Sequence, residues 1–315
     1  MHSTNSMILT ILERVRGYLD ESVFDAKYDN DFIVNHSIGP CIAEVMARVN
    51  MSMDNPVVLR YQVELVAGQE QYQLPANVGA VWRVALMDEQ GNVYWDAYPR
   101  GSYHWRGPNW TLEANQILFR PFPTRGRVVE VWYTPTGEFL PHYATDGYMM
   151  ENGEWMYLSD DPQYGMVDRR VNAYAGSTLR LLPDHPGVVE ERVIAEHDAY
   201  TGMVRVRLPF ERWEESFGGV PEVTSSSSSW GGLQVTYEIA PAGAESMYEA
   251  ISCRAAIKMG AYRNIQTKHR NMLKEEYQAA LKTVRDTLSN MQLRTGKYIE
   301  KSTVDNPSDL LVRMN

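Results

Sequence analysis

The order of hydrophobic periodicities along the chain constrains its fold more than any single motif. Residues 5–53 space their apolar side chains as helices do, and residues 57–239 change to the period of two that is typical of β-strands. Helical spacing returns at residues 244–292 and is followed by the mostly polar residues 293–315. This order predicts an α+β chain in which helices from both ends of the sequence form a bundle beside a β domain.

Two helices are predicted before residue 56. The first covers residues 7–20, and its apolar face consists of Ile8, Ile11, Leu12, Val15 and Leu19. After a turn at residues 28–31, a second helix is expected, with an apolar face of Ile38, Ile42, Val45, Met46 and Val49. Pro40 is expected in the first turn of that helix, where a missing N–H costs nothing.

The strand-rich middle begins at Val57. Residues 57–65 alternate, Asp88–Asn92 has the composition of a hairpin turn, and Trp110–Phe122 is expected to form a single strand. These strands predict an antiparallel β-sandwich or barrel-like domain over residues 57–135, inserted between the helices.

Residues 136–232 are less regular and are predicted to be a loop-rich β insertion. We expect long loops, a short helix or strands near residues 168–174, and a hairpin made by residues 188–196 and 203–208. The serine run at residues 225–229 is expected to be a loop tip. Residues 233–239 then close the sheet.

The last helical region has two apolar stripes separated by polar and basic residues 264–271. The first stripe is Tyr248, Ile251, Ala255, Met259 and Tyr262, and the second is Leu273, Tyr277, Leu281, Val284, Leu288 and Met291. The region is therefore either a helical hairpin, which we favour, or one rod of about 70 Å. The expected domains are residues 1–56, 57–135, 136–232, 233–292 and an extended tail over 293–315.

Charge is distributed unevenly along this chain of net charge −10. In residues 245–301, Lys and Arg outnumber Asp and Glu by five, whereas the preceding residues are strongly acidic. A basic helix on an acidic body can bind nucleic acid, but no zinc-finger spacing, basic zipper or aromatic RNA-binding signature accompanies the charge. Sequence-specific DNA reading is therefore not expected.

No motif predicts catalysis, a cofactor or a metal site. The seven histidines lack metal-ligand spacing, and Thr295-Gly296-Lys297 lacks the flanking residues of a phosphate-binding loop. Cys41 and Cys253 lie in different predicted helices and are expected to be unpaired thiols. No stretch approaches the roughly 18 apolar residues that a membrane span requires.

Two other functional classes remain open at this point. The clustered aromatic residues Trp95, Tyr103, Trp105 and Trp110 are compatible with a carbohydrate-binding β-sandwich module. The adjacent carboxylates Asp160-Asp161 and Glu190-Glu191 are compatible with a polysaccharide-degrading enzyme. Aromatic residues also fill cores and protein interfaces, and adjacent acids are usually solvated, so neither class is favoured.

Several short segments resemble a known family. The segment Gly68-Gln69-Glu70-Gln71-Tyr72-Gln73-Leu74-Pro75 is followed by Val81-Trp82-Arg83-Val84 and Asp88-Glu89-Gln90-Gly91, and Ile117–Pro123 precedes a strand that ends in Tyr133 and Pro135. The helix from Glu245 contains Ala250, Ala255 and Ala256, followed by Tyr277–Leu281. Together these segments resemble the head-to-tail adaptor proteins of tailed bacteriophages, also called head completion or tail tubular adaptor proteins.

The resemblance implies a structural virion protein at the head-tail junction, assembled in the host cytoplasm. Such proteins form a ring of about twelve copies beneath the portal protein. A tail or nozzle protein binds below, and genomic DNA passes through the lumen during ejection without specific binding. The resemblance implies no enzymatic activity, no cofactor and no membrane contact.

The candidate partner-binding residues lie in the last helices and the tail. A basic set is expected to meet an acidic surface of the portal or of a neighbouring copy, and it consists of Arg254, Lys258, Arg263, Lys268 and Arg270. The tail is expected to order on the portal surface through Lys297, Tyr298, Ile299, Lys301, Leu310 and Leu311.

Overall fold

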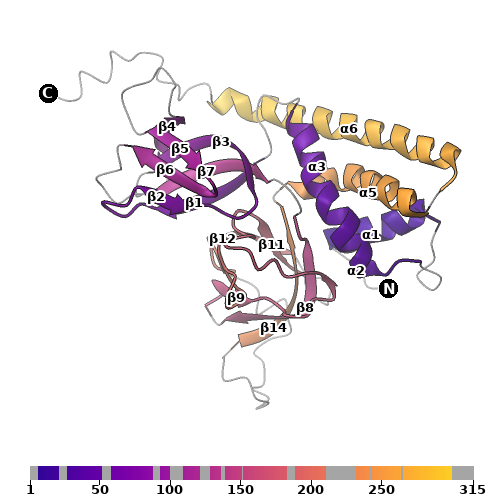
Figure 1. Ribbon diagram of the computed structural model, residues 1–315, viewed down its shortest axis with the longest axis horizontal. Coiled ribbons are helices and arrows are strands. Elements are labelled where there is room, and N and C mark those ends of the chain that lie inside the picture. The colour runs from indigo at the N-terminus through magenta and orange to yellow at the C-terminus, as the bar shows by residue number, and fades with distance from the viewer. Residues whose placement is uncertain are drawn as a thin grey trace.

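The computed structural model of the chain describes residues 6–20, 27–51, 58–87, 93–99, 109–120, 128–135, 139–150, 152–182, 189–210, 232–241, 243–263 and 265–299. In this part of the chain, helices pack beside two separate β-sheets. Figure 1 shows the first sheet on the left, the second sheet below, and the helices on the right with α6 along the top. The expected combination of helices with antiparallel sheets is confirmed.

Helices from the two ends of the sequence pack against each other. α1 (Met7–Tyr18) and α3 (Gly39–Asn50) both contact α5 (Tyr248–Arg263), which also contacts α6 (Thr267–Ile299). Four small residues of α5 are fully buried, and they allow the neighbouring helices to approach closely: Ala250, Ser252, Ala255 and Ala256. The predicted apolar faces of the first two helices are buried in this packing.

The second helical segment begins earlier than the sequence pattern predicted. α2 (Asn30–Ile33), the π-helical turn η1 (Val34–Ile38) and α3 follow one another directly. The side chain of Asp29 caps α2 by accepting a hydrogen bond from the N–H of Phe32 at 2.6 Å. An aspartate at this position supplies the partner that the first turn lacks, so the predicted turn at residues 28–31 is where this helix begins.

Pro40 lies in the first turn of α3, as predicted, although the helical segment continues before it through α2 and η1. The N–H of Gly39 bonds to the carbonyl of Val34, five residues earlier, which is the π-helical pattern. A proline lacks the N–H that an α-helix interior requires, and its ring collides with the preceding turn. The wider π turn immediately before Pro40 provides the room that the ring needs.

The last helical region is a hairpin and not one rod. α5 ends at Arg263 and α6 begins at Thr267, and the two helices pack on each other. At the turn, the N–H of Ile265 donates to the carbonyl of Gly260 at 3.2 Å, and the Ile265 side chain covers Gly260 so closely that a Cβ there would lie 2.5 Å from Ile265 Cδ1. The polar residues between the stripes thus contain the break.

α6 continues further than predicted. It runs to Ile299, so the first residues of the predicted extended tail are helical. A single glycine such as Gly296 costs about 1 kcal/mol inside a helix, which is too little to end one that is already formed. The buried residues of α6 lie along one face, and they are Leu273, Tyr277, Ala280, Leu281 and Val284. This face packs into the chain's own core.

The first sheet has the strand order β1-β7-β3-β4-β5-β6-β2 among the described residues. Its strands are β1 (Leu59–Glu64), β2 (Gln71–Gln73), β3 (Val78–Met87), β4 (Val93–Pro99), β5 (Asn109–Glu113), β6 (Gln116–Arg120) and β7 (Val128–Pro135). Among the strand pairs of this sheet that the structure describes, only β4–β5 is parallel. Strands from both edges share one apolar core that includes Val63, Tyr72, Trp110, Phe119 and Val131.

The predicted strand at residues 110–122 is a hairpin. β5 and β6 pair antiparallel across a turn at Ala114 and Asn115. Ala114 adopts a positive φ of 53°, and the Asn115 side chain donates to the carbonyl of Leu74 at 2.9 Å. Apolar residues on both sides of the turn concealed it, because a turn without glycine or proline gives little signal.

The second sheet is a closed barrel built mainly from the region predicted to be a loop-rich insertion. Its strands are β8 (His142–Met150), β9 (Trp155–Tyr157), β10 (Tyr164–Gly165), β11 (Thr178–Leu181), β12 (Glu190–Asp198), β13 (Met203–Val206) and β14 (Gly232–Ala240). The order is β10-β8-β14-β11-β12-β13-β9, and β8 also pairs with β9, which closes the barrel. β14 lies between β8 and β11, so it belongs to this barrel and does not close the first sheet.

β14 also explains why the helices and the barrel form one core. Val235, Tyr237 and Ile239 are buried on one face of the strand, and Thr236 and Glu238 are buried on the other. Helices and barrel contribute to a single apolar cluster, whereas the first sheet has its own. A strand covered on both faces loses the period-two pattern that normally identifies it.

Residues 166–176, here called the bridge segment, join the barrel to the first sheet. The N–H of Ala76 donates to the carbonyl of Val171 at 3.0 Å, and the hydroxyl of Tyr133 donates to the carbonyl of Ala175 at 2.9 Å. Gly176 lies directly on the backbone of β1 at Arg60. No α-helix forms at residues 168–174, contrary to one prediction, because this segment consists of turns that contact both β units.

Candidate interaction surfaces and the hub that positions them

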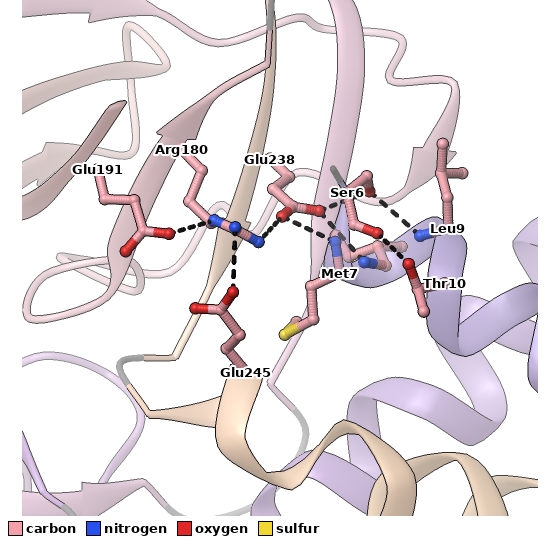
Figure 2. Close-up of polar contacts among 9 residues, drawn as sticks. Ser6, Met7, Leu9, Thr10, Arg180, Glu191, Glu238 and Glu245 are labelled. Carbon is pink, nitrogen blue, oxygen red and sulfur yellow. Dashed lines mark hydrogen bonds and ion pairs between the residues drawn. The ribbon is translucent and has the colours of Figure 1, made fainter. Parts of the chain in front are cut away.

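One buried carboxylate holds the N-terminus of α1 on the barrel. The side chain of Glu238, on β14, is 0% exposed. It accepts hydrogen bonds from Ser6 Oγ at 2.6 Å and from the N–H of Met7 at 3.0 Å (Figure 2), and a third from the N–H of Ile8 at 3.2 Å. A helix N-terminus has unpaired N–H groups and partial positive charge, so an anion stabilises it. Glu238 therefore fixes α1 relative to the barrel.

Arg180, on β11, neutralises this carboxylate. Its guanidinium lies 2.6 Å from Glu238 Oε1, 2.7 Å from Glu191 Oε1 and 3.4 Å from Glu245 Oε1 (Figure 2). Burial lowers the pKa of Arg180, but the facing carboxylates of Glu238, Glu191 and Glu245 outweigh it, and the net pKa is raised. The guanidinium stays charged. We call Ser6, Arg180 and Glu238 the hub, because they connect α1, β11 and β14.

A pocket of about 370 Å³ lies beside the hub. It is lined by residues of α1, β11 and the start of α5, among them Ser6, Met7, Thr10, Arg180, Glu245 and Tyr248. Because three carboxylates already match the charge of Arg180, the pocket offers no free cation to an anionic ligand.

Arg254, a predicted partner-binding residue, is engaged within the chain. Its Nε lies 2.9 Å from Glu44 Oε2 on α3, and Arg48 binds the same carboxylate at 3.0 Å. The guanidinium of Arg254 also lies over the ring of Tyr277 on α6, 6.0 Å from the centroid. Arg254 thus links three helices, and any contact with another protein would compete with these interactions.

Lys258 lies one turn after Arg254 on α5 and is half-buried. Its charge acts on the Cys41 thiol of α3. Burial raises the pKa of Cys41 to about 12, and the positive charges of Lys258 and Arg254 oppose this increase. Lys268 and Arg270 are both exposed in the first turn of α6. Residues two apart on a helix point to different sides, so this pair does not form one face.

The remaining predicted residues lie at or beyond the edge of the described part. Arg263 ends α5, and Lys297, Tyr298 and Ile299 lie in the last turn of α6, but their side chains are outside the description. Lys301, Leu310 and Leu311 fall outside the described residues. The assignment of all these residues to partner binding stays a prediction.

A partly exposed aromatic patch that sequence reasoning missed lies beside the hairpin tip. The rings of Tyr28 and Phe32 stack at 4.9 Å, His36 lies 4.5 Å from Phe32, and Tyr262 lies 6.2 Å from Phe32. Tyr262 is 52% exposed, although its spacing had placed it in a buried stripe. Aromatic residues are enriched at protein interfaces. The four-residue spacing of Tyr28, Phe32 and His36 is the signal that identifies the patch in the sequence.

The residues behind the two alternative functions do not form the expected sites. Trp110 is 8% exposed, packs in the core of the first sheet and donates its indole N–H to the carbonyl of Ala97 at 3.0 Å, so it is no sugar-stacking surface. Trp95 has no described side chain, and Tyr103 and Trp105 lie outside the described residues.

Arginines engage most of the carboxylates considered for catalysis. Asp160 pairs with Arg169, Glu190 with Arg192, and Glu191 with Arg180. Within the described ranges, no group of three or more His, Cys, Asp or Glu side chains is arranged to hold a metal ion. In the same part of the chain, none of the helices combines the length and apolar character needed to cross a membrane.

Comparison with known families places most of the first half of the chain in a family. A family model described as SU10 adaptor protein matches residues 8–176, which is more than half of the chain. The match includes α1 to α3, all of the first sheet, the first strands of the barrel and the bridge segment. No curated protein sequence matches the chain.

Proposed function

We propose that this chain, which belongs to the SU10 adaptor protein family, forms a ring of about twelve copies at the head-tail junction of a phage. The family identifies the chain as a phage adaptor, a structural protein. In the proposal, the end of α6 and the residues after it dock to the portal protein, and the β units face the tail or nozzle protein. Genomic DNA passes through the lumen of the ring.

The observation that carries the proposal is the family match across the helices and the first sheet. Two features of the structure support it. The helical hairpin buries one face of α6 and leaves charged side chains at its tip, Lys268 and Arg270, exposed for other proteins. The aromatic patch lies at the opposite end of α5 from the hub, where a neighbouring copy can cover it.

The acidic character of residues 1–244 supports a passive conduit for DNA. Like charge on the lumen wall suppresses phosphate contacts, so that DNA slides without being held. The basic residues of the hairpin are then available for an acidic protein surface. Binding through these residues should weaken as salt increases.

Native mass spectrometry of the purified chain, alone and mixed with the portal ring of the same phage, tests the proposal. We expect complexes that contain one portal ring and about twelve copies of the chain. A chain that stays monomeric and leaves the portal mass unchanged would contradict the adaptor role. The mass of the complex reports binding whichever surface of the chain makes the contact.

Removing residues 295–315 is expected to abolish portal binding. The truncation keeps the buried stripe of α6 from Leu273 to Val284, so the free energy of unfolding should change by less than about 1 kcal/mol. Portal affinity, measured by biolayer interferometry, should decrease at least about a hundredfold, equivalent to about 2.7 kcal/mol. Unchanged affinity in a folded truncated chain would show that the portal contact lies elsewhere.

The double charge reversal Lys268→Glu and Arg270→Glu is expected to weaken assembly on the portal about tenfold. Both side chains are exposed and belong to the predicted basic set, so their reversal replaces attraction to an acidic surface with repulsion. The double reversal Lys274→Glu and Lys282→Glu is the matched control, since both side chains are exposed further along the same helix. Equal effects of the two variants would indicate a general charge effect, not a contact at the hairpin tip.

A further inference from the structure

The bridge segment is attached to the first sheet on one side and to the barrel on the other. Asn172 makes both attachments with one side chain. Its Nδ2 donates to the hydroxyl of Tyr61 on β1 at 3.1 Å, and its Oδ1 accepts from the backbone N–H of His197 on β12 at 3.0 Å. The N–H of Gly176 also donates to the carbonyl of Ile194 on β12 at 2.8 Å. Loss of this segment from the barrel would therefore loosen both β units.

Tyr174 places the bridge segment on two buried histidines. Its ring centroid lies 4.8 Å from that of His197 and 6.2 Å from that of His142 on β8. The Tyr174 hydroxyl accepts from the N–H of Asp168 at 2.7 Å. Because Tyr174 is fully buried, the segment cannot leave the barrel without exposing this ring and the histidines beneath it.

The two imidazoles have few polar partners. His142 Nε2 lies 2.5 Å from the hydroxyl of Tyr237 on β14, and that hydroxyl accepts a hydrogen bond from the N–H of Ser159 at 2.8 Å. Among the described residues, His142 Nδ1 and both ring nitrogens of His197 have no hydrogen-bond partner. An imidazolium in this position would be a buried charge with unsatisfied N–H donors, which is costly.

The charged groups around the pair do not remove this cost. Asp168 and Asp198 favour a positive charge on His197, whereas Arg169 opposes a charge on both histidines and His197 opposes one on His142. The Asp168 carboxylate is already bound by Arg170, with Nε–Oδ1 at 2.8 Å. Burial dominates these effects, and it lowers the pKa of His142 to about 3 and that of His197 to about 4.

We infer that the bridge segment is an acid-released clasp: protonation of His142 and His197 detaches Tyr174 from the barrel and uncouples the barrel from the first sheet. This conformational role goes beyond the proposed adaptor function and does not depend on it. It rests on three features together, which are the two buried imidazoles with few polar partners, the ring that covers them and the segment that links both β units.

The direction of the pH dependence follows from the lowered pKa values. An imidazole in the released state regains its ordinary pKa of 6.5, so this state binds more protons than the closed state below that pH. The closed state is fully favoured above about pH 6.5, and its advantage decreases as the pH falls towards 4. Between pH 8 and pH 5, each histidine that is released should increase the opening constant about thirtyfold.

Hydrogen exchange of the full chain between pH 8 and pH 5 tests this inference. After correction for the intrinsic exchange rates, amides of residues 166–176 should lose at least about thirtyfold of their protection. Amides of α5, in the centre of the helices, should keep theirs. If both regions keep their protection, or if both lose it together, release of the clasp is not a local event and the inference is overturned.

His197→Phe removes one titratable group and keeps a ring against Tyr174. We expect it to reduce the pH effect about thirtyfold, and His36→Gln, on the exposed helix face, to leave it unchanged. If His197→Phe does not fold, an NMR titration of the wild-type imidazoles replaces it. If the imidazoles of His142 and His197 stay neutral until the amides of residues 166–176 open, the clasp is supported. If His197 titrates above pH 6 while the segment is still closed, the inference is overturned.

Discussion

Replacing Glu238 with alanine is expected to lower the free energy of unfolding by about 3–5 kcal/mol. The fully buried carboxylate is bound by Arg180 at 2.6 Å and by donors from the first turn of α1. Without it, the guanidinium loses its most buried partner and the N-terminus of α1 loses its anion. Urea denaturation followed by circular dichroism measures the change, with the slope of the transition as a check on two-state unfolding.

Glu245→Ala is the matched control for this prediction. Glu245 contacts the same guanidinium at 3.4 Å, but its side chain is 66% exposed, so the loss should stay below about 1 kcal/mol. Glu238→Gln keeps the shape and removes the charge, and it should fall between the two. A Glu238→Ala variant as stable as Glu245→Ala would show that Arg180 and α1 are held by something other than the hub.

Gly176→Ala is expected to cost about 3 kcal/mol by combining two effects. Gly176 adopts a φ of +80°, which L side chains rarely tolerate, and an added Cβ would lie 2.8 Å from the Arg60 carbonyl oxygen and 3.1 Å from the Arg60 nitrogen. Both are backbone atoms of β1, so the rotation of a side chain cannot relieve the contact. The bridge segment should separate from the first sheet, and limited proteolysis at residues 166–176 should be faster.

Gly68→Ala separates the two effects. Gly68 has nearly the same φ, +84°, but apart from its two chain neighbours no described residue has an atom within 4 Å of its added Cβ. Its cost should therefore be only the conformational penalty, about 1–2 kcal/mol. Equal losses at the two glycines, measured by urea denaturation, would mean that the approach of the bridge segment to β1 contributes nothing to stability.

The hub and the bridge segment together connect the three parts of the molecule. The hub holds α1 on the barrel, and the bridge segment holds the barrel on the first sheet. In the proposed adaptor, this connection would transmit a movement from the portal side to the tail side. Glu238→Ala tests the hub and Gly176→Ala tests the bridge segment, and the two effects can be separated because these residues lie in different elements.

Sequence periodicity predicted the elements in which one face is buried and the other is solvated. α1 is an example, with Ile8, Ile11 and Val15 buried on one side and Glu13 and Gly17 exposed. The β12–β13 hairpin follows the same principle, since its turn at Asp198–Gly202 is specified by local hydrogen bonds to the Asp198 side chain. In α1 and in the β12–β13 hairpin, residues that are close together in the sequence specify the structure.

The pattern failed where tertiary contacts bury both faces or replace local structure. Residues 135–187 were predicted to be rich in loops, because buried polar residues such as His142 and Tyr174 interrupt the apolar alternation, yet they supply β8 and the bridge segment. The hub was not predictable from sequence, since a glutamate and an arginine 58 residues apart give no local signal of pairing. The sequence also did not indicate that Arg254, a member of the predicted basic set, binds Glu44.

The sequence by itself determined the class of the fold, the helices at both ends, most of the strands and the family resemblance, because those depend on local periodicity and short motifs. The tertiary structure alone decided that the second sheet closes into a barrel, that β14 belongs to it and that Glu238 anchors α1. Strand pairing and buried ion pairs join residues distant in sequence, and their energies depend on burial, which no local pattern records.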